Sequence, residues 1–311
     1  MRKTLFIIVS WAWLATACTS ASPLHGSQSG PRVIVVETFL ADIVQNIAGE
    51  RLVIDSLMPA GVDPHSYQPS PQDVARIVES DLIILNQTGL EGALDDVILN
   101  AGGDFVLVEA AAGLEARHPA EEEGGLSDHE DEHGEEIDPH YWLNPLNVIT
   151  YVENITAALV EVDPQGADEY EHNAAAYIEE LKELDRWISA ELAKIPAERR
   201  LLVTNHESLG YFADHYGFQV IGAIIPSATT GASPTAQDLA ALTRQIQETG
   251  APAIFLETGA NPRLAEQLAL ETGIQIAPPL YSHSTNDGEG PASTYLEMMR
   301  YNTSIIVEAL R

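Results

Sequence analysis

The chain has 311 residues, 45% of them hydrophobic, and carries 15 lysine and arginine residues against 47 aspartate and glutamate residues, a formal net charge of −32. A chain of this length and apolar content can build two domains with buried cores. The acidity excludes nucleic acid as a partner, because binding its phosphates requires basic patches, and it favours cations and solubility instead. A surface that is acidic only for solubility is the alternative explanation.

The first 17 residues have the pattern of a secretory signal peptide, with basic residues before a short apolar run and small residues before Cys18. The apolar run is too short for an ordinary membrane span. Cys18 is the only cysteine, and its position after Ala-Thr-Ala resembles the cleavage site of a bacterial lipoprotein. We predict a signal peptide over 1–17, then a segment over 18–31 that is anchored in membrane lipid through Cys18 and serves as a flexible tether. A soluble exported protein is the alternative.

Residues 32–160 alternate between strand and helix patterns. Apolar runs rich in β-branched residues predict strands at 32–38, 52–57, 81–86 and 105–109. Apolar spacing and cap residues predict helices at 39–49, 71–79, 94–99 and 147–160. The alternation predicts an α/β lobe in which helices flank a small, mostly parallel sheet.

Residues 111–137 interrupt this lobe. Between His118 and His140 the sequence has ten acidic residues, four histidines and no lysine or arginine. Such a segment cannot pack a core, so we predict a mobile loop. His118, His129 and His133 either capture metal transiently in this loop or are incidental histidines of a solvated acidic segment.

One long helix is predicted from Asp168 to about Lys194, within a linking segment over 161–197. Its apolar residues recur every three or four positions and form one stripe: Tyr170, Ala174, Tyr177, Leu181, Leu184, Ile188 and Leu192. We expect this stripe to pack across the body of the protein and the helix to join two lobes. The repeat spans only about three heptads, which argues against an oligomeric coiled coil and for a monomer.

Residues 198–311 repeat the pattern of the first half and predict a second α/β lobe. Strands are expected at 201–204, 219–225, 253–257 and 274–278, and helices at 208–216, 235–248, 261–272 and 291–310.

Four histidines follow predicted strands or the acidic loop: His65, His140, His206 and His283. In open α/β sheets, ligands bind beyond the carboxyl ends of the strands. Two of the histidines come from each lobe, so a site in the cleft between the lobes could use all four. Imidazole suits zinc, and also nickel, copper and iron, so the pattern predicts a metal site.

Four segments carry a family resemblance: Val-Asp-Pro-His-Ser-Tyr-Gln-Pro-Ser-Pro at 62–71, Asp-Pro-His-Tyr-Trp-Leu-Asn-Pro at 138–145, Thr-Asn-His-Glu-Ser-Leu-Gly-Tyr-Phe at 204–212, and Gly-Pro-Ala-Ser-Thr-Tyr-Leu at 290–296. Together they resemble the zinc/manganese-binding solute receptors of bacterial metal ABC importers, the cluster A-I or TroA-like (ZnuA-like) family. The resemblance implies two lobes joined by one long helix, a metal between them, delivery to a membrane permease, and no catalysis. It places His65, His140 and His206 on the first three ligand positions.

The fourth ligand position departs from the family, which usually carries an aspartate in segment 280–287. His283 stands at that position, and Asp287 is the alternative ligand if the loop is shifted. Manganese prefers oxygen ligands and imidazole favours zinc, so a site with nitrogen ligands only predicts zinc as cargo, with manganese as the alternative. Four neutral ligands leave the metal's charge uncompensated, and we expect the acidic chain to offset it only at longer range.

Four polar residues flank these histidines. Asp138 and Asn144 either orient His140 through hydrogen bonds or cap turns. Glu207 is expected on the solvated surface, and Glu257 is expected to be an ordinary polar residue at a strand end. If manganese bound as tightly as zinc, Asp287 or Glu257 would complete the site instead of His283.

Two other classes of function are open at this point. A secreted zinc hydrolase needs an open coordination position for water, whereas four protein ligands leave none, and the sequence lacks a His-Glu-x-x-His motif. A surface adhesin or interaction protein is the other class, and cell-binding tests on a variant without the cleft ligands would decide it. The sequence therefore favours a metal receptor, exported to the periplasm or to the outer face of the bacterial cytoplasmic membrane.

Overall fold

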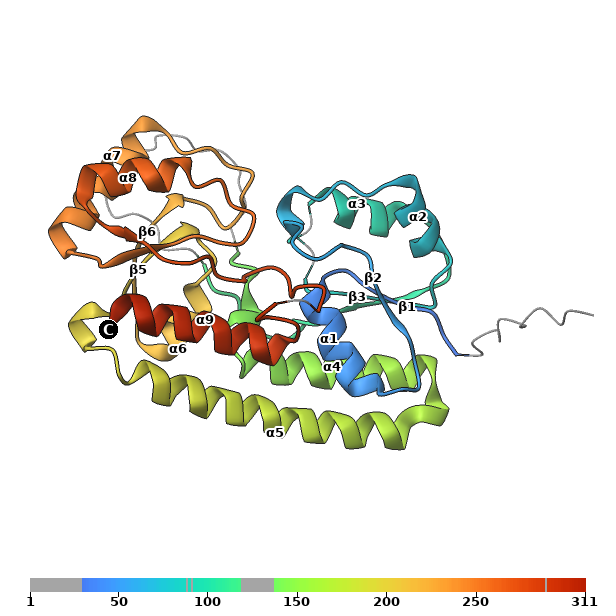
Figure 1. Ribbon diagram of the computed structural model, residues 1–311. Helices are drawn as coiled ribbons and strands as arrows, with labels where there is room; N and C mark the ends of the chain where they lie inside the picture. Colours follow the sequence, from blue (N-terminus) through green and yellow to red (C-terminus); the bar gives the residue numbers. More distant parts are fainter. Residues whose placement is uncertain (1–29, 88, 91, 119–136, 289) are drawn as a thin grey trace, which may run out of the picture.

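The structure is a computed structural model that describes residues 30–87, 89–90, 92–118, 137–288 and 290–311. Two four-stranded parallel sheets lie in separate lobes above one long helix that runs beneath both (Figure 1). The predicted signal peptide, Cys18, His129 and His133 lie outside the described residues. Among the residues that are described, no helix is both long and apolar enough to cross a membrane.

The N-terminal sheet has the strand order β2-β1-β3-β4. Its central strands β1 and β3 are fully buried, as their continuous apolar runs predict, and its edge strands are partly exposed. One sheet face packs on α1 and α4, and the other packs on α2 and α3. The elements are β1 (Val33–Val35), α1 (Thr38–Ala48), β2 (Ile54–Ser56), α2 (Pro71–Val78), β3 (Leu82–Leu85), α3 (Ala93–Asn100), β4 (Val106–Glu109) and α4 (Asn147–Val162).

The C-terminal sheet has the strand order β6-β5-β7-β8. Its elements are β5 (Leu201–His206), α6 (Gly210–Tyr216), β6 (Gln219–Ile225), α7 (Ala236–Thr249), β7 (Ala253–Phe255), α8 (Arg263–Thr272), β8 (Gln275–Ile276) and α9 (Tyr295–Leu310). The last helix begins four residues after the predicted start at Pro291, because Thr294 forms its N-cap and accepts a hydrogen bond from the backbone N–H of Glu297.

The long helix α5 (Ala167–Leu192) buries all seven residues of the predicted stripe. It packs against α1, α4 and α9, and therefore contacts helices from both halves of the chain. Because the same buried cluster continues from one lobe through this helical layer into the other, the lobes share one core on the α5 side. The predicted fold, two α/β lobes with parallel sheets joined by one long helix, is confirmed.

Candidate metal centre

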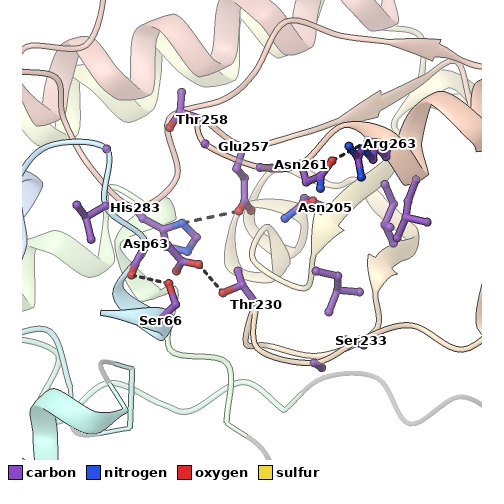
Figure 2. Close-up of a pocket in the computed structure, with 18 of the residues that line it drawn as sticks. Asp63, Ser66, Asn205, Thr230, Ser233, Glu257, Thr258, Asn261, Arg263 and His283 are labelled. Carbon is purple, nitrogen blue, oxygen red and sulfur yellow. Dashed lines mark hydrogen bonds and ion pairs between the residues drawn. The ribbon is translucent and has the colours of Figure 1, made fainter. Parts of the chain in front are cut away.

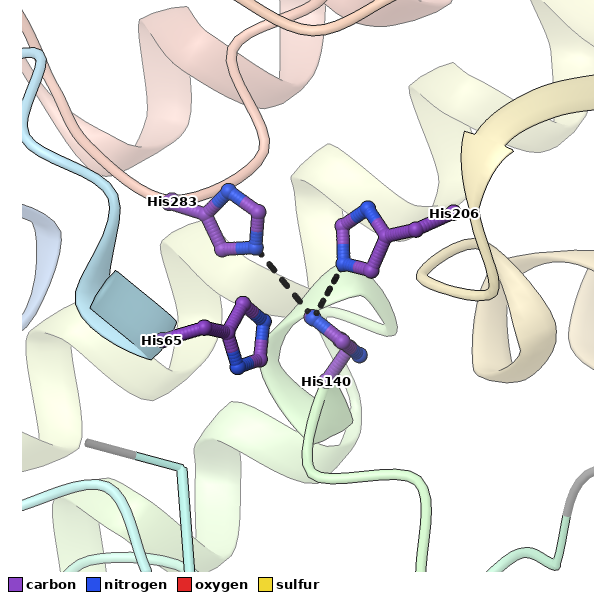
Figure 3. Close-up of side chains that lie close together, drawn as sticks. All are labelled: His65, His140, His206 and His283. Atoms are coloured by element: carbon purple, nitrogen blue, oxygen red, sulfur yellow. Dashed lines mark hydrogen bonds between the residues drawn. The ribbon is translucent and has the colours of Figure 1, made fainter. Parts of the chain in front are cut away.

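Four histidine rings converge between the two lobes (Figure 3). In the described ranges, His65, His140, His206 and His283 are the residues found as a possible metal-ligand group, and their ligand atoms all lie within 4.8 Å of one another. Nε2 of His140 is 3.2 Å from Nε2 of His206 and 3.3 Å from Nε2 of His283. A tetrahedron with an edge of about 3.3 Å has its corners about 2.0–2.1 Å from its centre, the usual zinc–nitrogen distance.

Each histidine is positioned by a different local structure. His65 lies in the short 3-10 turn η1 (Pro64–Ser66), where Asp63 caps the turn by accepting a 3.0 Å hydrogen bond from the His65 backbone N–H. His140 precedes the turn η2 (Tyr141–Leu143), His206 ends β5, and His283 lies between β8 and α9. The donors therefore come from four separate segments, and only the tertiary fold brings them together.

Asp138 orients His140. Its Oδ1 lies 2.8 Å from Nδ1 of His140 and accepts a 3.0 Å hydrogen bond from the His140 backbone N–H. This contact assigns the ring proton to Nδ1 and leaves the Nε2 lone pair facing the centre of the group. Burial raises the pKa of Asp138 to about 7, while the His140 backbone N–H and Arg117 act in the opposite direction. Asn144 caps a turn instead, since its Oδ1 accepts from the Leu146 backbone N–H.

Glu257 contacts two of the four rings. Its Oε1 lies 2.8 Å from Nδ1 of His206. Its Oε2 lies 3.7 Å from Nδ1 of His283 (Figure 2). Burial opposes ionisation of Glu257, but the two histidines and a 2.8 Å hydrogen bond from the Ser208 hydroxyl hold its pKa at about 2. The expectation of charge compensation only at longer range is wrong, because a buried carboxylate contacts Nδ1 of His140 and another contacts Nδ1 of His206.

The surroundings favour neutral imidazoles at three of the four positions. Burial lowers the pKa of His65 to about 2, lowers the pKa of His140 well below its usual value, and lowers the pKa of His283. Burial also opposes the charged form of His206, but Glu257 outweighs it and raises the His206 pKa. Both ring nitrogens of His65 are buried without a hydrogen-bond partner in the described part of the chain. Because metals bind neutral imidazole, the residues present fit a metal cation.

The segment that carries His283 is held by the N-terminal lobe, although it follows the last strand of the C-terminal sheet. Three hydrogen bonds from that lobe fix it: Trp142 Nε1–H to Ser282 O at 2.8 Å, Gly61 N–H to Ser284 Oγ at 2.9 Å, and Thr285 N–H to Thr38 Oγ1 at 3.0 Å. Asp287, the alternative fourth ligand, is exposed and lies outside the group of four.

A cavity of about 600 Å³ opens between the lobes beside the histidines, and His283 is the member of the group that lines it. Asp63 accepts a hydrogen bond from the Thr230 hydroxyl across this cavity (Figure 2). The same carboxylate caps the turn that carries His65. One side chain thus joins a predicted ligand to the loop of the opposite lobe.

The remaining predicted residues are not part of this group of ligand atoms. His118 is exposed and outside the group. Glu207 is partly buried rather than on the solvated surface as expected, and its backbone N–H donates to Ser227 O at 3.0 Å. Sequence reasoning missed the contacts that Glu257 and Arg117 make around the centre. A sheet order with β5 beside β7 would have brought Glu257 to His206, but the sequence does not reveal that order.

Residues 33–309 match the family described as zinc-uptake complex component A, periplasmic (ZnuA). The manganese-binding lipoprotein MntA of Halalkalibacterium halodurans is 34% identical over 315 residues, which cover 100% of this chain and 99% of that protein.

Solved structures of metal-binding proteins resemble this chain over most of its length. The periplasmic zinc-binding protein TroA of Treponema pallidum has a TM-score of 0.79 at 30% identity, covering 90% of this chain and 99% of that one. A manganese-bound periplasmic metal-binding protein of Candidatus Liberibacter asiaticus has a TM-score of 0.78 at 29% identity, covering 90% and 100%.

Proposed function

The chain belongs to the zinc-uptake complex component A family of metal-binding receptors for ABC importers, and on this basis we propose that it binds one zinc ion through His65, His140, His206 and His283. Members of this family bind a substrate and hand it to a membrane permease, and they are not enzymes. The metal is therefore cargo, held by a closed set of protein ligands and released to the permease.

The observation that carries the choice of zinc is the set of donors. The ligand atoms that lie together are all imidazole nitrogens, and two of their separations, 3.2 and 3.3 Å, suit a tetrahedral ion of zinc's size. Manganese prefers oxygen ligands and gains none here. Relatives are named for different metals, MntA for manganese and TroA for zinc. Family membership therefore does not identify the metal, and the choice of zinc rests on the ligand atoms of this chain.

We also propose that Cys18 is acylated after removal of residues 1–17 and anchors the receptor in membrane lipid. The support is the small-residue sequence before the only cysteine, together with the description of relatives such as MntA as lipoproteins. Anchoring at the outer face of the membrane would keep the receptor close to its permease.

The experiment is a titration of the metal-free mature protein with zinc and with manganese. We expect one tight zinc ion per chain and manganese binding weaker by at least about 100-fold, or roughly 2.7 kcal/mol. His140→Ala should abolish tight binding, whereas the matched control His172→Ala, on the exposed face of α5, should not change it. His283→Asp should narrow the gap between the two metals. Equal or tighter manganese binding by the wild type would contradict the proposal.

A further inference from the structure

Arg117 contacts Asp138, the residue that orients His140. In the sequence, Arg117 precedes residues 119–136 and Asp138 follows them. Nη1 of Arg117 is 3.5 Å from Oδ2 of Asp138, and its Nε is 2.9 Å from Oδ2 of Asp214 on α6. The two backbones also pair, because the Asp138 N–H donates to the Arg117 carbonyl at 2.8 Å. Asp138 has no exposed side-chain surface and Asp214 is 67% exposed, so the contact with Asp138 is the desolvated one.

In its ionised form, Asp138 needs this partner. Its two ion-pair contacts among the described residues are with Arg117 and with His140, and a metal-binding His140 is neutral. Arg117 is then the formal cation beside a fully buried carboxylate, and a buried charge without a partner is strongly unfavourable. Because the other oxygen of that carboxylate orients His140, any displacement of Asp138 reaches the ligand ring.

Neighbouring residues hold the pair in one position. The Arg117 backbone N–H donates to the Tyr211 hydroxyl at 2.8 Å, and this hydroxyl donates to the Asp138 carbonyl at 3.1 Å. Gly210, at the start of α6, leaves room for both side chains. A Cβ at Gly210 would lie 2.5 Å from atoms of Arg117 and of Asp138, so no larger residue fits without displacing the pair.

We infer that Arg117 is a positioning residue of the metal centre, which acts through Asp138 to hold His140 with Nε2 directed at the metal. The inference rests on the proposed ligation of zinc by His140. It extends the site to Arg117, which precedes the acidic segment in the sequence, and through Asp214 to helix α6 of the other lobe.

The test is a double-mutant cycle on zinc affinity. Partners of metal-bound histidines typically contribute about 10–100-fold in metal affinity, and we expect Arg117→Met to raise the zinc Kd by about tenfold. Arg117→Gln, which keeps hydrogen-bonding groups but loses the charge, should do the same, and Arg117→Lys should restore part of the affinity. In an Asp138→Asn background, Arg117→Met should cause no further loss, because its effect passes through that carboxylate.

The matched control is Arg76→Met, which removes an arginine of α2 that pairs with Asp73 on the same helix and with Asp55 on β2. It should lower stability without changing the zinc Kd. The tautomer of His140, read from its ring nitrogen chemical shifts, should change in Arg117→Met and stay as in the wild type in Arg76→Met.

The outcomes separate the two claims. Wild-type affinity in both Arg117→Met and Arg117→Gln, or additive effects of Arg117→Met and Asp138→Asn, would overturn the inference while leaving zinc ligation intact. Absence of tight zinc binding by the wild type, or its persistence in His140→Ala, would instead overturn the proposed function on which the inference rests.

Discussion

Nδ1 of His206 lies 2.8 Å from Oε1 of Glu257. The two residues lie at the carboxyl ends of the neighbouring parallel strands β5 and β7. His206 ends β5, and Glu257 comes two residues after β7, its parallel neighbour. The contact sets the carboxyl group of Glu257 against Nδ1 of His206, on the other side of the ring from Nε2, which faces His140. Two buried acidic side chains, Asp138 and Glu257, thus lie behind the proposed ligands, and Glu257 is held in its ionised form.

Replacing Glu257 with Gln should lower zinc affinity by about 10–100-fold, because it removes the negative charge that contacts His206. Isothermal titration with a competing chelator measures the change. Glu266→Gln, an exposed carboxylate on α8, is the matched control and should bind zinc as the wild type does. Undiminished affinity in Glu257→Gln would show that the carboxylate plays no part in binding.

The hydrogen bond from Thr230 to Asp63 crosses the cavity between the lobes and should slow metal exchange. Hydrogen bonds to charged groups contribute about 1.5–3 kcal/mol, so Thr230→Val should speed zinc release by about tenfold in stopped-flow chelation. Thr229→Val is the control, because the Thr229 hydroxyl contacts Ser227 within the same loop. Equal release rates in the two variants would refute a gating contact.

Residues 119–136 should be dispensable for the tight site. The chain enters and leaves this segment at the paired backbones of Arg117 and Asp138, so a short turn can join residues 118 and 137 without disturbing His140. Deletion should leave one tight zinc ion per chain and remove weaker binding by His129 and His133, the two histidines of this segment. A chain without its tight site after deletion would place the main ligands in the segment.

Asp42 should make stability depend on pH. It accepts a 2.8 Å hydrogen bond from the Tyr295 backbone N–H at the contact of α1 with α9, and burial raises its pKa from 3.8 to about 6. The folded protein therefore binds this proton more tightly than the unfolded chain, and the stabilisation is present below about pH 4 and lost as the pH rises through 6. Asp42→Asn should stabilise the metal-free protein by about 1–2 kcal/mol at pH 8 and change little at pH 4. Urea unfolding at both pH values measures the change in unfolding free energy that Asp42→Asn causes. A stabilisation that is larger at pH 4 than at pH 8 would contradict the prediction.

The sequence predicts features that depend on local periodicity. The stripe of α5 follows from its spacing, and the four histidines follow from their positions after strands. Glu257 and Arg117 could not be found in this way, because strand order creates one contact and a backbone pairing across residues 119–136 creates the other. The start of α9 at Tyr295 could have been predicted from the sequence, since Thr294 and Glu297 have the spacing of a helix cap.

X-ray absorption at the zinc edge, on mature protein loaded with one equivalent of zinc, tests the four-histidine centre most directly. The structure predicts four nitrogen neighbours at about 2.0–2.1 Å, with the outer-shell scattering of imidazole rings and no oxygen ligand. Five or six neighbours, or a carboxylate or water oxygen among the four, would contradict ligation by His65, His140, His206 and His283.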